Sequence, residues 1–341
     1  MTTAWTRRRV ALVIGFCLVA AGPQAHAAAA TAPRCATLFT AAESAAFSRF
    51  AAGRVTAAVH DTRTGCWYHL NRGARISTAS VIKAQVLAAL LLKAQDAGRQ
   101  LTVRERALIA PMIRLSSDQS TSALYGAVGG VSGMYAYDRR LGIGNTTHDS
   151  RYGATSTTAE DRTRVSVDLL YGGGPLRSAA RAEAWRYMGD VHPTQQWGLT
   201  AGNRLGWSAA LKNGFYPGTG GRWRVGTTGF VRRDGTRHGY AITVMTTGVV
   251  DQATGMRWVE AVSARVAAIL TPGRISRRAV DRARCVVPRQ GESWPGVASR
   301  LQVPARWREV QLVSGGNPVP VSRGRACAPE LRATGWLRGS G

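Results

Sequence analysis

Lysine is scarce in this chain of 341 residues: only Lys83, Lys93 and Lys212 are lysines among 45 basic residues, and all the others are arginines. An arginine guanidinium cannot lose its proton in a protein, whereas a desolvated lysine amine can. The three lysines are therefore candidates for positions at which chemistry needs an amine that can lose its proton.

Several common kinds of site are also missing. The six histidines show no metal-ligand spacing and no Cys-x-x-Cys pair occurs, which argues against a zinc site. No glycine-rich phosphate-binding motif opens a helix, so we expect no nucleotide and no other cofactor.

The formal net charge is +26, but the arginines are scattered, which argues against nucleic acid as a partner. The charge either attracts the chain to an anionic cell wall or membrane surface, or it is solubilising and reflects the base composition of the genome.

No apolar run is long enough to span a bilayer, which takes about 20 residues. The run Val10–Gly22 follows the charged Arg7–Arg9 and precedes the small-x-small site Ala25–Ala27. This order is typical of a signal peptide. We therefore predict a signal peptide over residues 1–27, a secreted or cell-wall-associated, extracytoplasmic protein, and no integral membrane span.

Four cysteines remain after the predicted signal peptide: Cys35, Cys66, Cys285 and Cys327. An even number in an exported chain predicts two disulfides. Sequence proximity favours the pairs Cys35–Cys66 and Cys285–Cys327, and free buried thiols are the alternative.

The hydrophobic periodicity is typical of an α/β (α+β) fold. The turn signals Thr64-Gly65 and Asp234-Gly235 predict two β-hairpins. Helices are expected at 37–52, 80–97, 103–113, 118–128, 158–170 and 255–270, and strands at 54–61, 66–71, 208–215, 223–233 and 237–247. This order predicts an antiparallel sheet built from both ends of a domain and flanked by helices, with an all-helical subdomain inserted.

The pattern breaks after residue 271, where we place the end of a domain over residues 28–271. Residues 272–284 are rich in Pro, Gly and Arg and are interpreted as a linker. Residues 285–329 would form a small module with a cysteine at each edge, and 330–341 a tail. A module of this size has a small core, so a disulfide would stabilise it.

Ser80 and Lys83 are three residues apart in the strongest expected helix, so their side chains share one face. A serine hydroxyl is a poor nucleophile until a base takes its proton. A neutral lysine amine in a desolvated site can act as that base. The pair alone is a weak signal, because a capping serine and an exposed lysine can have the same spacing.

Two further segments strengthen this interpretation. Ser117-Asp118-Gln119 falls at an expected helix start, and Lys212-Asn213-Gly214, followed by Phe215, falls on an expected strand. Serine penicillin-binding proteins and class A β-lactamases carry S-x-x-K, S-D-N and K-T-G in this order. The chain resembles that superfamily from about residue 35 to residue 270.

The resemblance implies a role for each matching residue. Ser80 would be the acylated nucleophile, Lys83 would accept its proton, and Ser117 would relay a proton to the leaving nitrogen. Lys212 would favour anionic substrates. The substrate-binding groups would be the side chains of Gln119 and Asn213, Gly214 of the strand motif, and the backbone N–H groups of Ser80 and Phe215 as an oxyanion hole. The implied substrates are β-lactams or peptidoglycan peptides.

The chain also departs from the family pattern. S-D-N is replaced by S-D-Q, and K-T-G by K-N-G. Arg151-Tyr152-Gly153 resembles the family's Arg-Trp-Glu step, with Gly153 in place of the glutamate that activates the deacylating water. The nearest acids are Asp149 in a loop and Glu160 and Asp161, which we interpret as first-turn charges of a helix. We therefore expect acylation with slow deacylation, and the alternative is a non-catalytic wall-binding protein or β-lactam sensor with a decayed site.

The C-terminal module resembles a lysin-motif (LysM) domain, a class that binds the glycan chains of peptidoglycan. The matching residues are Gly291-Glu292-Ser293-Trp294, Val297, Ala298, Leu301, Val303, Trp307, Leu312, Asn317 and Gly324. One extra residue lies between Leu312 and Asn317, and Cys327 stands where an apolar residue is usual. The resemblance implies cell-wall glycan as a partner, and the alternative is a small structural cap.

Overall fold

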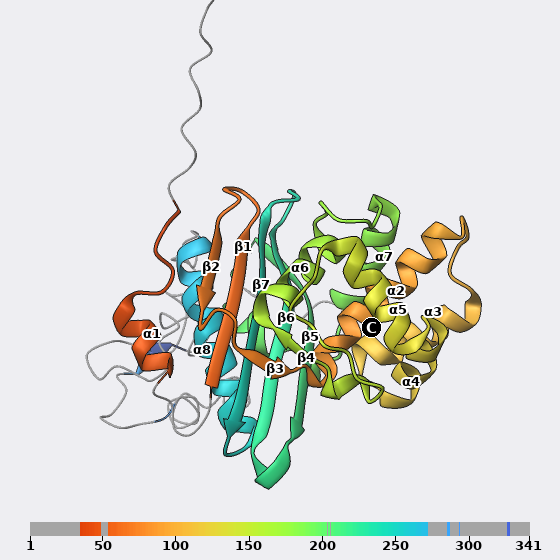
Figure 1. Cartoon of the computed structure of the whole chain (residues 1–341). Coiled ribbons are helices and arrows are strands. Elements are labelled where there is room, and N and C mark those ends of the chain that lie inside the picture. Colours follow the sequence, from red (N-terminus) through yellow and green to blue (C-terminus); the bar gives the residue numbers. More distant parts are fainter. Residues whose placement is uncertain are drawn as a thin grey trace, which may run out of the picture. The chain divides into compact units, whose positions relative to one another are not determined.

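The structure is a computed structural model that describes residues 35–48, 54–202, 204, 206–271, 285–286, 293 and 326–327 (Figure 1). The predicted signal peptide, the linker after residue 271, the tail and most of the C-terminal module lie outside these residues. No helix among the described residues has the length and hydrophobicity needed to cross a membrane.

The central element is a five-stranded antiparallel sheet in the order β2-β1-β7-β6-β5. Its strands are β1 (Arg54–Asp61), β2 (Trp67–Leu70), β5 (Trp207–Pro217), β6 (Trp223–Arg233) and β7 (Gly239–Val249). Gly65 and Gly235 have φ values of 75° and 74°, which a glycine adopts readily in a tight turn. The two predicted hairpins are confirmed, and β1 from the start of the domain pairs with β7 from its end.

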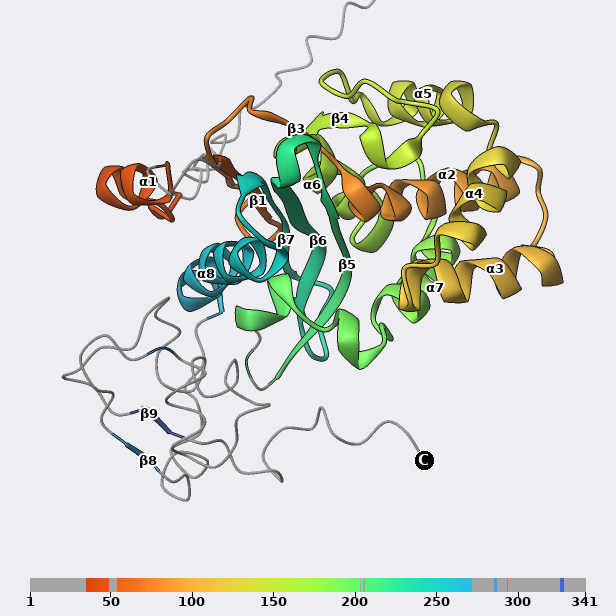
Figure 2. The same ribbon diagram turned by 90° about the horizontal axis from the view of Figure 1, so that it is seen from below.

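Helices cover both faces of this sheet (Figures 1 and 2). The helix α8 (Gln252–Leu270) packs against β6 and β7 on one face, with α1 (Ala41–Ser48) beside it through a ring contact of Phe47 and Trp258. The helix α6 (Ala159–Leu170) packs against β1, β6 and β7 on the other face. The sheet is therefore the middle layer of the fold.

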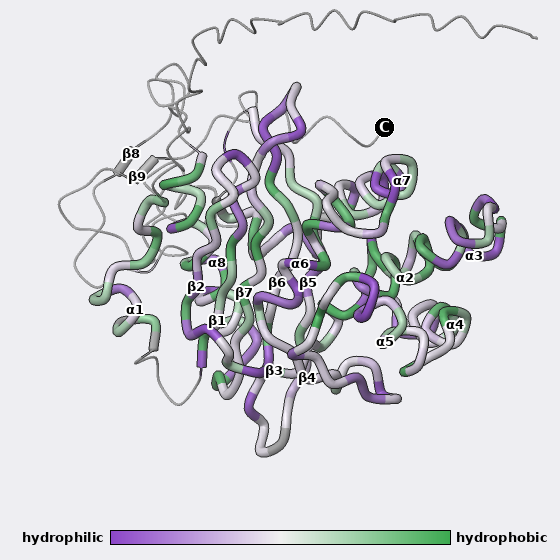
Figure 3. Tube along the Cα trace, turned by 45° about the horizontal axis from the view of Figure 1, so that its top comes forward, coloured by the Kyte–Doolittle hydropathy of each residue, from purple (hydrophilic) through white to green (hydrophobic). Residues whose placement is uncertain are grey.

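The remaining helices form a block on the side of α6. They are α2 (Ile82–Asp96), α3 (Val103–Arg114), α4 (Asp118–Ala127), α5 (Gly130–Leu141) and α7 (Ser178–Met188). Nearly every residue of α2 is buried, as its run of Leu and Ala predicts, and Figure 3 shows α2 coloured largely as hydrophobic. A two-stranded ribbon of β3 (Arg75–Ser77) and β4 (Ser156–Thr158) joins this block to the sheet side.

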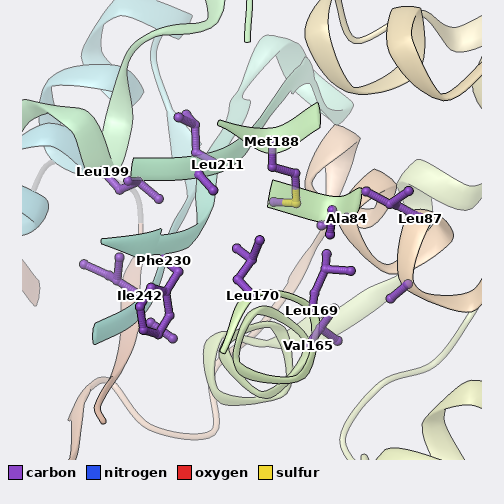
Figure 4. Close-up of a cluster of buried hydrophobic side chains, with 14 of the residues drawn as sticks. Ala84, Leu87, Val165, Leu169, Leu170, Met188, Leu199, Leu211, Phe230 and Ile242 are labelled. Atoms are coloured by element: carbon purple, nitrogen blue, oxygen red, sulfur yellow. The ribbon is translucent and has the colours of Figure 1, made fainter. Parts of the chain in front are cut away.

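One hydrophobic core joins the helical block to the sheet. Figure 4 shows side chains of α2, α6, α7, three strands and the 3-10 turn η4 (Gly198–Gly202) pointing toward one another. The labelled residues are Ala84, Leu87, Val165, Leu169, Leu170, Met188, Leu199, Leu211, Phe230 and Ile242. The helix α2 packs into this core. The residues directly before α2, including Ser80, are therefore held in place by a packed helix.

The predicted α/β (α+β) class, with its antiparallel sheet and helical subdomain, is confirmed. The helices α5 and α7 were not expected. The helix α5 begins at Gly130 and also contains Gly133, and glycine disfavours a helix. The helix α7 is rich in alanine and buries only Ala184, Tyr187 and Met188.

The predicted disulfide Cys35–Cys66 is present, with 5.7 Å between the two Cα atoms. It ties the segment before α1 to the start of β2. The backbone of the C-terminal module forms a short antiparallel pair, β8 (Cys285–Val286) with β9 (Ala326–Cys327). Cys285 lies directly opposite Cys327 in this pair, and such positions have Cα separations that a disulfide can span. The Cys285–Cys327 disulfide stays a prediction that this register supports.

Candidate active site

The candidate nucleophile lies in a strained turn at the start of α2. Ser80 is the middle residue of the 3-10 turn η1 (Ala79–Val81), is half-buried, and makes no side-chain hydrogen bond to another described residue. Ala79 before it has a φ of 48°, a conformation that is unfavourable for a residue with a Cβ atom. Such strain persists where the surroundings enforce it and is common at functional sites. Here the backbone N–H of Thr78 donates to the Thr155 carbonyl at 2.9 Å and anchors the turn.

The edge strand β5 lies directly against this turn, and Gly214 makes the approach possible. A Cβ atom on Gly214 would lie 2.6 Å from the Ser80 nitrogen and 2.5 Å from the Val81 nitrogen, closer than packed atoms allow. Every larger residue would push the strand away from the nucleophile. The glycine of the K-N-G motif is therefore required by the packing of β5 on the serine turn.

Lys83 lies one turn after Ser80 and is fully buried. Its Nζ donates to the Ser116 carbonyl at 2.6 Å, to Ser116 Oγ at 3.2 Å and to Asp118 Oδ1 at 2.7 Å. Burial lowers the pKa of Lys83, and the hydrogen bond and charge of Asp118 oppose that shift. An amine with a lowered pKa can take the proton of a neighbouring hydroxyl more readily than an exposed lysine can.

Lys212 on β5 is the second buried amine of the site. Its Nζ donates to Ser116 Oγ at 3.0 Å and to the Asn213 carbonyl at 2.6 Å. Burial and then the positive charge of Lys83 hold the pKa of Lys212 well below its usual range. Lys93, the third lysine, is exposed and donates to the Ala127 carbonyl outside this cluster.

The hydroxyl that joins the two amines belongs to Ser116, and not to the expected Ser117. Ser116 has a φ of 62°, so its side chain turns toward both lysines. Ser117 instead is the N-cap of α4, where its Oγ accepts from the Ser120 N–H at 3.3 Å. The motif that faces the lysines is therefore Ser116-Ser117-Asp118, one residue earlier than S-D-Q.

This shift brings Asp118 to Lys83 and leaves Gln119 exposed on α4, without a side-chain hydrogen bond to any described residue. The Tyr152 hydroxyl donates to Asp118 Oδ1 at 3.0 Å, and its ring centroid lies 6.0 Å from Lys83 Nζ. Burial and the neighbouring Asp118 raise the pKa of Tyr152 to about 12, so this hydroxyl keeps its proton. Burial raises the pKa of Asp118, but the hydrogen bond and charge of Lys83 outweigh it and leave that pKa lowered.

Asn213 is also placed differently from the expectation. Its side chain is buried, and its Nδ2 donates to the Gln195 carbonyl at 2.7 Å and the Trp197 carbonyl at 3.2 Å. The amide therefore holds the segment before β5 instead of facing the serine. Phe215 follows on the same strand, half-buried, with its ring 6.3 Å from that of Trp197.

Gly153, which the resemblance aligns with the family's glutamate, lies beside the nucleophile turn and has no side chain. A Cβ atom on Gly153 would lie 3.8 Å from the backbone of Ala79, so this glycine is next to the nucleophile turn. The nearby acids are engaged elsewhere. Glu160 pairs with His69, Arg72 and Arg164, Asp161 accepts from Asn145 and Thr146, and Asp149 pairs with Arg151. Both Glu160 and Asp161 lie in the first turn of α6, as the sequence predicts.

A buried arginine fixes the loop that carries Tyr152. Arg162 is 1% exposed and its guanidinium donates to Gln85, Thr146 and Thr157. Gln85 is on α2, so this network connects the loop to the helix that follows Ser80. Tyr152 therefore reaches Asp118 from a supported backbone.

Ser116, Asp118 and Tyr152 are the site residues that sequence reasoning did not assign. The available signal for Ser116 was the double serine Ser116-Ser117, which allows two alignments of the motif. Only the backbone conformation of Ser116 decides between them.

Comparison with protein-family models and with curated proteins finds no match for the chain. Solved structures do match. A β-lactamase from Xanthomonas campestris superposes with a TM-score of 0.59 at 19% identity, over 67% of this chain and 96% of that one. The structure of PBP-A gives a TM-score of 0.57 at 17% identity, over 66% and 92%. A class A β-lactamase from Mycobacterium abscessus gives 0.56 at 18%, over 66% and 96%. The chain therefore has the fold of the serine β-lactamases and penicillin-binding proteins.

Proposed function

We propose that the chain is an exported serine hydrolase that forms an acyl-Ser80 intermediate with β-lactams or peptidoglycan peptides. The observation that carries the proposal is the position of Ser116 Oγ, 3.2 Å from Lys83 Nζ and 3.0 Å from Lys212 Nζ. A hydroxyl between two buried amines can pass a proton in either direction. Lys83 also lies one turn after Ser80, and acyl transfer to serine needs a base close to the hydroxyl.

The reaction follows from these contacts. Lys83, once neutral, takes the proton of Ser80 Oγ as this oxygen attacks the substrate carbonyl. The backbone N–H groups of Ser80 and Phe215 stabilise the oxyanion. The amide C–N bond then breaks, and Ser116 gives its proton to the leaving nitrogen while it receives one from Lys83 or Lys212. Lys212 also provides positive charge for an anionic substrate group.

Deacylation is proposed to be slow. Hydrolysis of the acyl-Ser80 ester needs a base that activates water, and Gly153 supplies none. Asp118 is the carboxylate that contacts Lys83, but a carboxylate with a lowered pKa is a weak base. The acyl-enzyme is therefore expected to accumulate.

The location and the C-terminal module are part of the proposal and depend on the sequence. The signal-peptide pattern of residues 1–27 supports export, and the disulfide Cys35–Cys66 supports an oxidising compartment. Residues 285–329 are proposed to bind cell-wall glycan, with Cys285 and Cys327 joined.

The test is the intact mass of residues 28–341 during incubation with benzylpenicillin. We expect a persistent adduct on the wild type and none on the Ser80→Ala variant. Consumption of penicillin without an adduct would mean that deacylation is fast and that this part of the proposal is wrong. If no adduct forms and the penicillin is not consumed, the result favours the non-catalytic alternative.

A further inference from the structure

Asp118 gives the candidate site a chemical feature that the proposed reaction does not use. One oxygen of its carboxylate, Oδ1, accepts hydrogen bonds from both Lys83 Nζ and the Tyr152 hydroxyl. Its Oδ2 has no hydrogen bond to another described residue. The side chain as a whole is 78% exposed, so this second oxygen is available to a bound molecule.

Two contacts fix the carboxylate in place. Lys83 is fully buried, and Tyr152 belongs to the turn η2 (Tyr152–Ala154) that packs on the nucleophile turn η1. Gly153 of η2 lies against the backbone of Ala79, beside Ser80. The carboxylate of Asp118 is thus held by Lys83, one turn after Ser80, and by Tyr152, whose turn packs on η1.

The opposite side of the nucleophile turn is formed by β5, where Gly214 lies against the Ser80 backbone. The nucleophile turn therefore packs against both β5 and η2, and η2 carries the Tyr152 that binds Asp118. Ser116 Oγ connects the two buried amines of the same site.

An ionised carboxylate only accepts hydrogen bonds, in contrast to an amide side chain, which also donates. A substrate that covers Asp118 with a carbonyl or a carboxylate leaves the charged oxygen desolvated without a partner, which is costly. A substrate that places an N–H group against Asp118 Oδ2 donates a hydrogen bond in place of the displaced water.

We propose that Asp118 selects substrates that place an ammonium group, and not a carboxylate, against its second oxygen when Ser80 attacks their carbonyl. The inference depends on the proposed function, because it concerns the substrate of the same site. Asp118 is then a specificity-determining residue, and Tyr152 is a positioning residue that orients it.

The experiment compares the second-order acylation rates of three penicillins on the full mature chain. Ampicillin carries an ammonium on its side chain, carbenicillin carries a carboxylate at the same place, and benzylpenicillin carries neither. The wild type is expected to favour ampicillin over carbenicillin by about tenfold or more, the ratio typical of one hydrogen bond to a charged group. In Asp118→Asn the ratio should fall toward one, because the new amide can donate to the carboxylate.

Asp149→Asn is the matched control, since it removes the same charge from the loop that carries Tyr152 without a contact to Lys83. Its ratio should equal that of the wild type. Equal ratios in the wild type and Asp118→Asn would overturn the inference while acylation itself stands. A fall of the same size in Asp149→Asn would also overturn it, because the preference would then come from general charge. No labelling of wild-type Ser80 by any of the three compounds would refute the proposed function, and this inference with it.

Discussion

Removal of the Ser116 hydroxyl is the most informative change to the candidate site. Ser116→Ala deletes the group that lies 3.2 Å from Lys83 Nζ and 3.0 Å from Lys212 Nζ. A positioned proton-transfer group typically contributes about 10²- to 10⁴-fold to a rate. We therefore expect acylation by a penicillin to slow by about that factor, which corresponds to about 3–5 kcal/mol of transition-state stabilisation.

The effect on folding should be small by comparison. Lys83 keeps the carbonyl of Ser116 and the carboxylate of Asp118 as acceptors, and Lys212 keeps the Asn213 carbonyl. Loss of the remaining hydrogen bonds typically costs about 1 kcal/mol each in the free energy of unfolding. Thermal unfolding should show that the variant is folded at the temperature of the assay.

Ser117→Ala is the matched control, one residue away. It removes the N-cap of α4, which typically costs about 0.5–2 kcal/mol of stability. Its acylation rate should stay within about twofold of the wild type, because the Oγ of Ser117 makes no hydrogen bond to Lys83 or Lys212 in the structure. Stopped-flow or mass-spectrometric acylation rates measure both variants. A large loss in Ser117→Ala with little change in Ser116→Ala would refute the assignment and restore the role first expected from the sequence.

Three further predictions follow from the same geometry. Gly214→Ala should abolish acylation, because its Cβ atom would lie 2.6 Å from the backbone nitrogen of the nucleophile. Gly126→Ala on α4 is the control, since that position has open space around it, and it should be acylated at the wild-type rate. Equal acylation rates in the two variants would contradict this prediction. Asp118→Asn removes a charge that raises the pKa of the neighbouring buried lysine, so the rise of the acylation rate with pH should move to lower pH, and an unchanged or upward-shifted profile would contradict it. At the 2.7 Å separation the lost attraction is about 1.5 kcal/mol in bulk water, or about tenfold in rate at a pH below the midpoint. Replacement of Cys35 and Cys66 by serine opens a 31-residue loop, so the free energy of unfolding should fall by about 3–4 kcal/mol, and a calorimetric midpoint that stays within about 2 °C would count against it.

The sequence was sufficient for the fold because the strongest patterns belong to its framework. The sequence shows clear signals for the apolar helix α2, for the two hairpins and for the three long strands β5, β6 and β7. The helix α7 was missed because it buries few side chains and its apolar pattern is weak. The helix α5 was missed because it contains Gly130 and Gly133, and glycine disfavours a helix. A short strand such as β3 has too few residues to show a period at all.

The candidate site was predictable in its lysines and its nucleophile but not in its details. The rarity of lysine singled out Lys83 and Lys212, and the structure places both around one hydroxyl. Which hydroxyl it is depends on the φ of 62° at Ser116, a conformation that no propensity of serine indicates. The contact of Asp118 with Lys83 depends on the same shift of one residue. Tyr152 reaches the site through tertiary packing of a loop, which spacing along the chain cannot show.

The central claim is that Ser80 becomes acylated, and the intact mass of the mature chain after exposure to a penicillin tests it most directly. The expected result is one added penicillin mass that appears on the wild type, persists over time and maps to the peptide that contains Ser80. The Ser80→Ala variant should show no added mass under the same conditions. An adduct on Ser80→Ala, or none on the wild type while the penicillin stays intact, would contradict the claim.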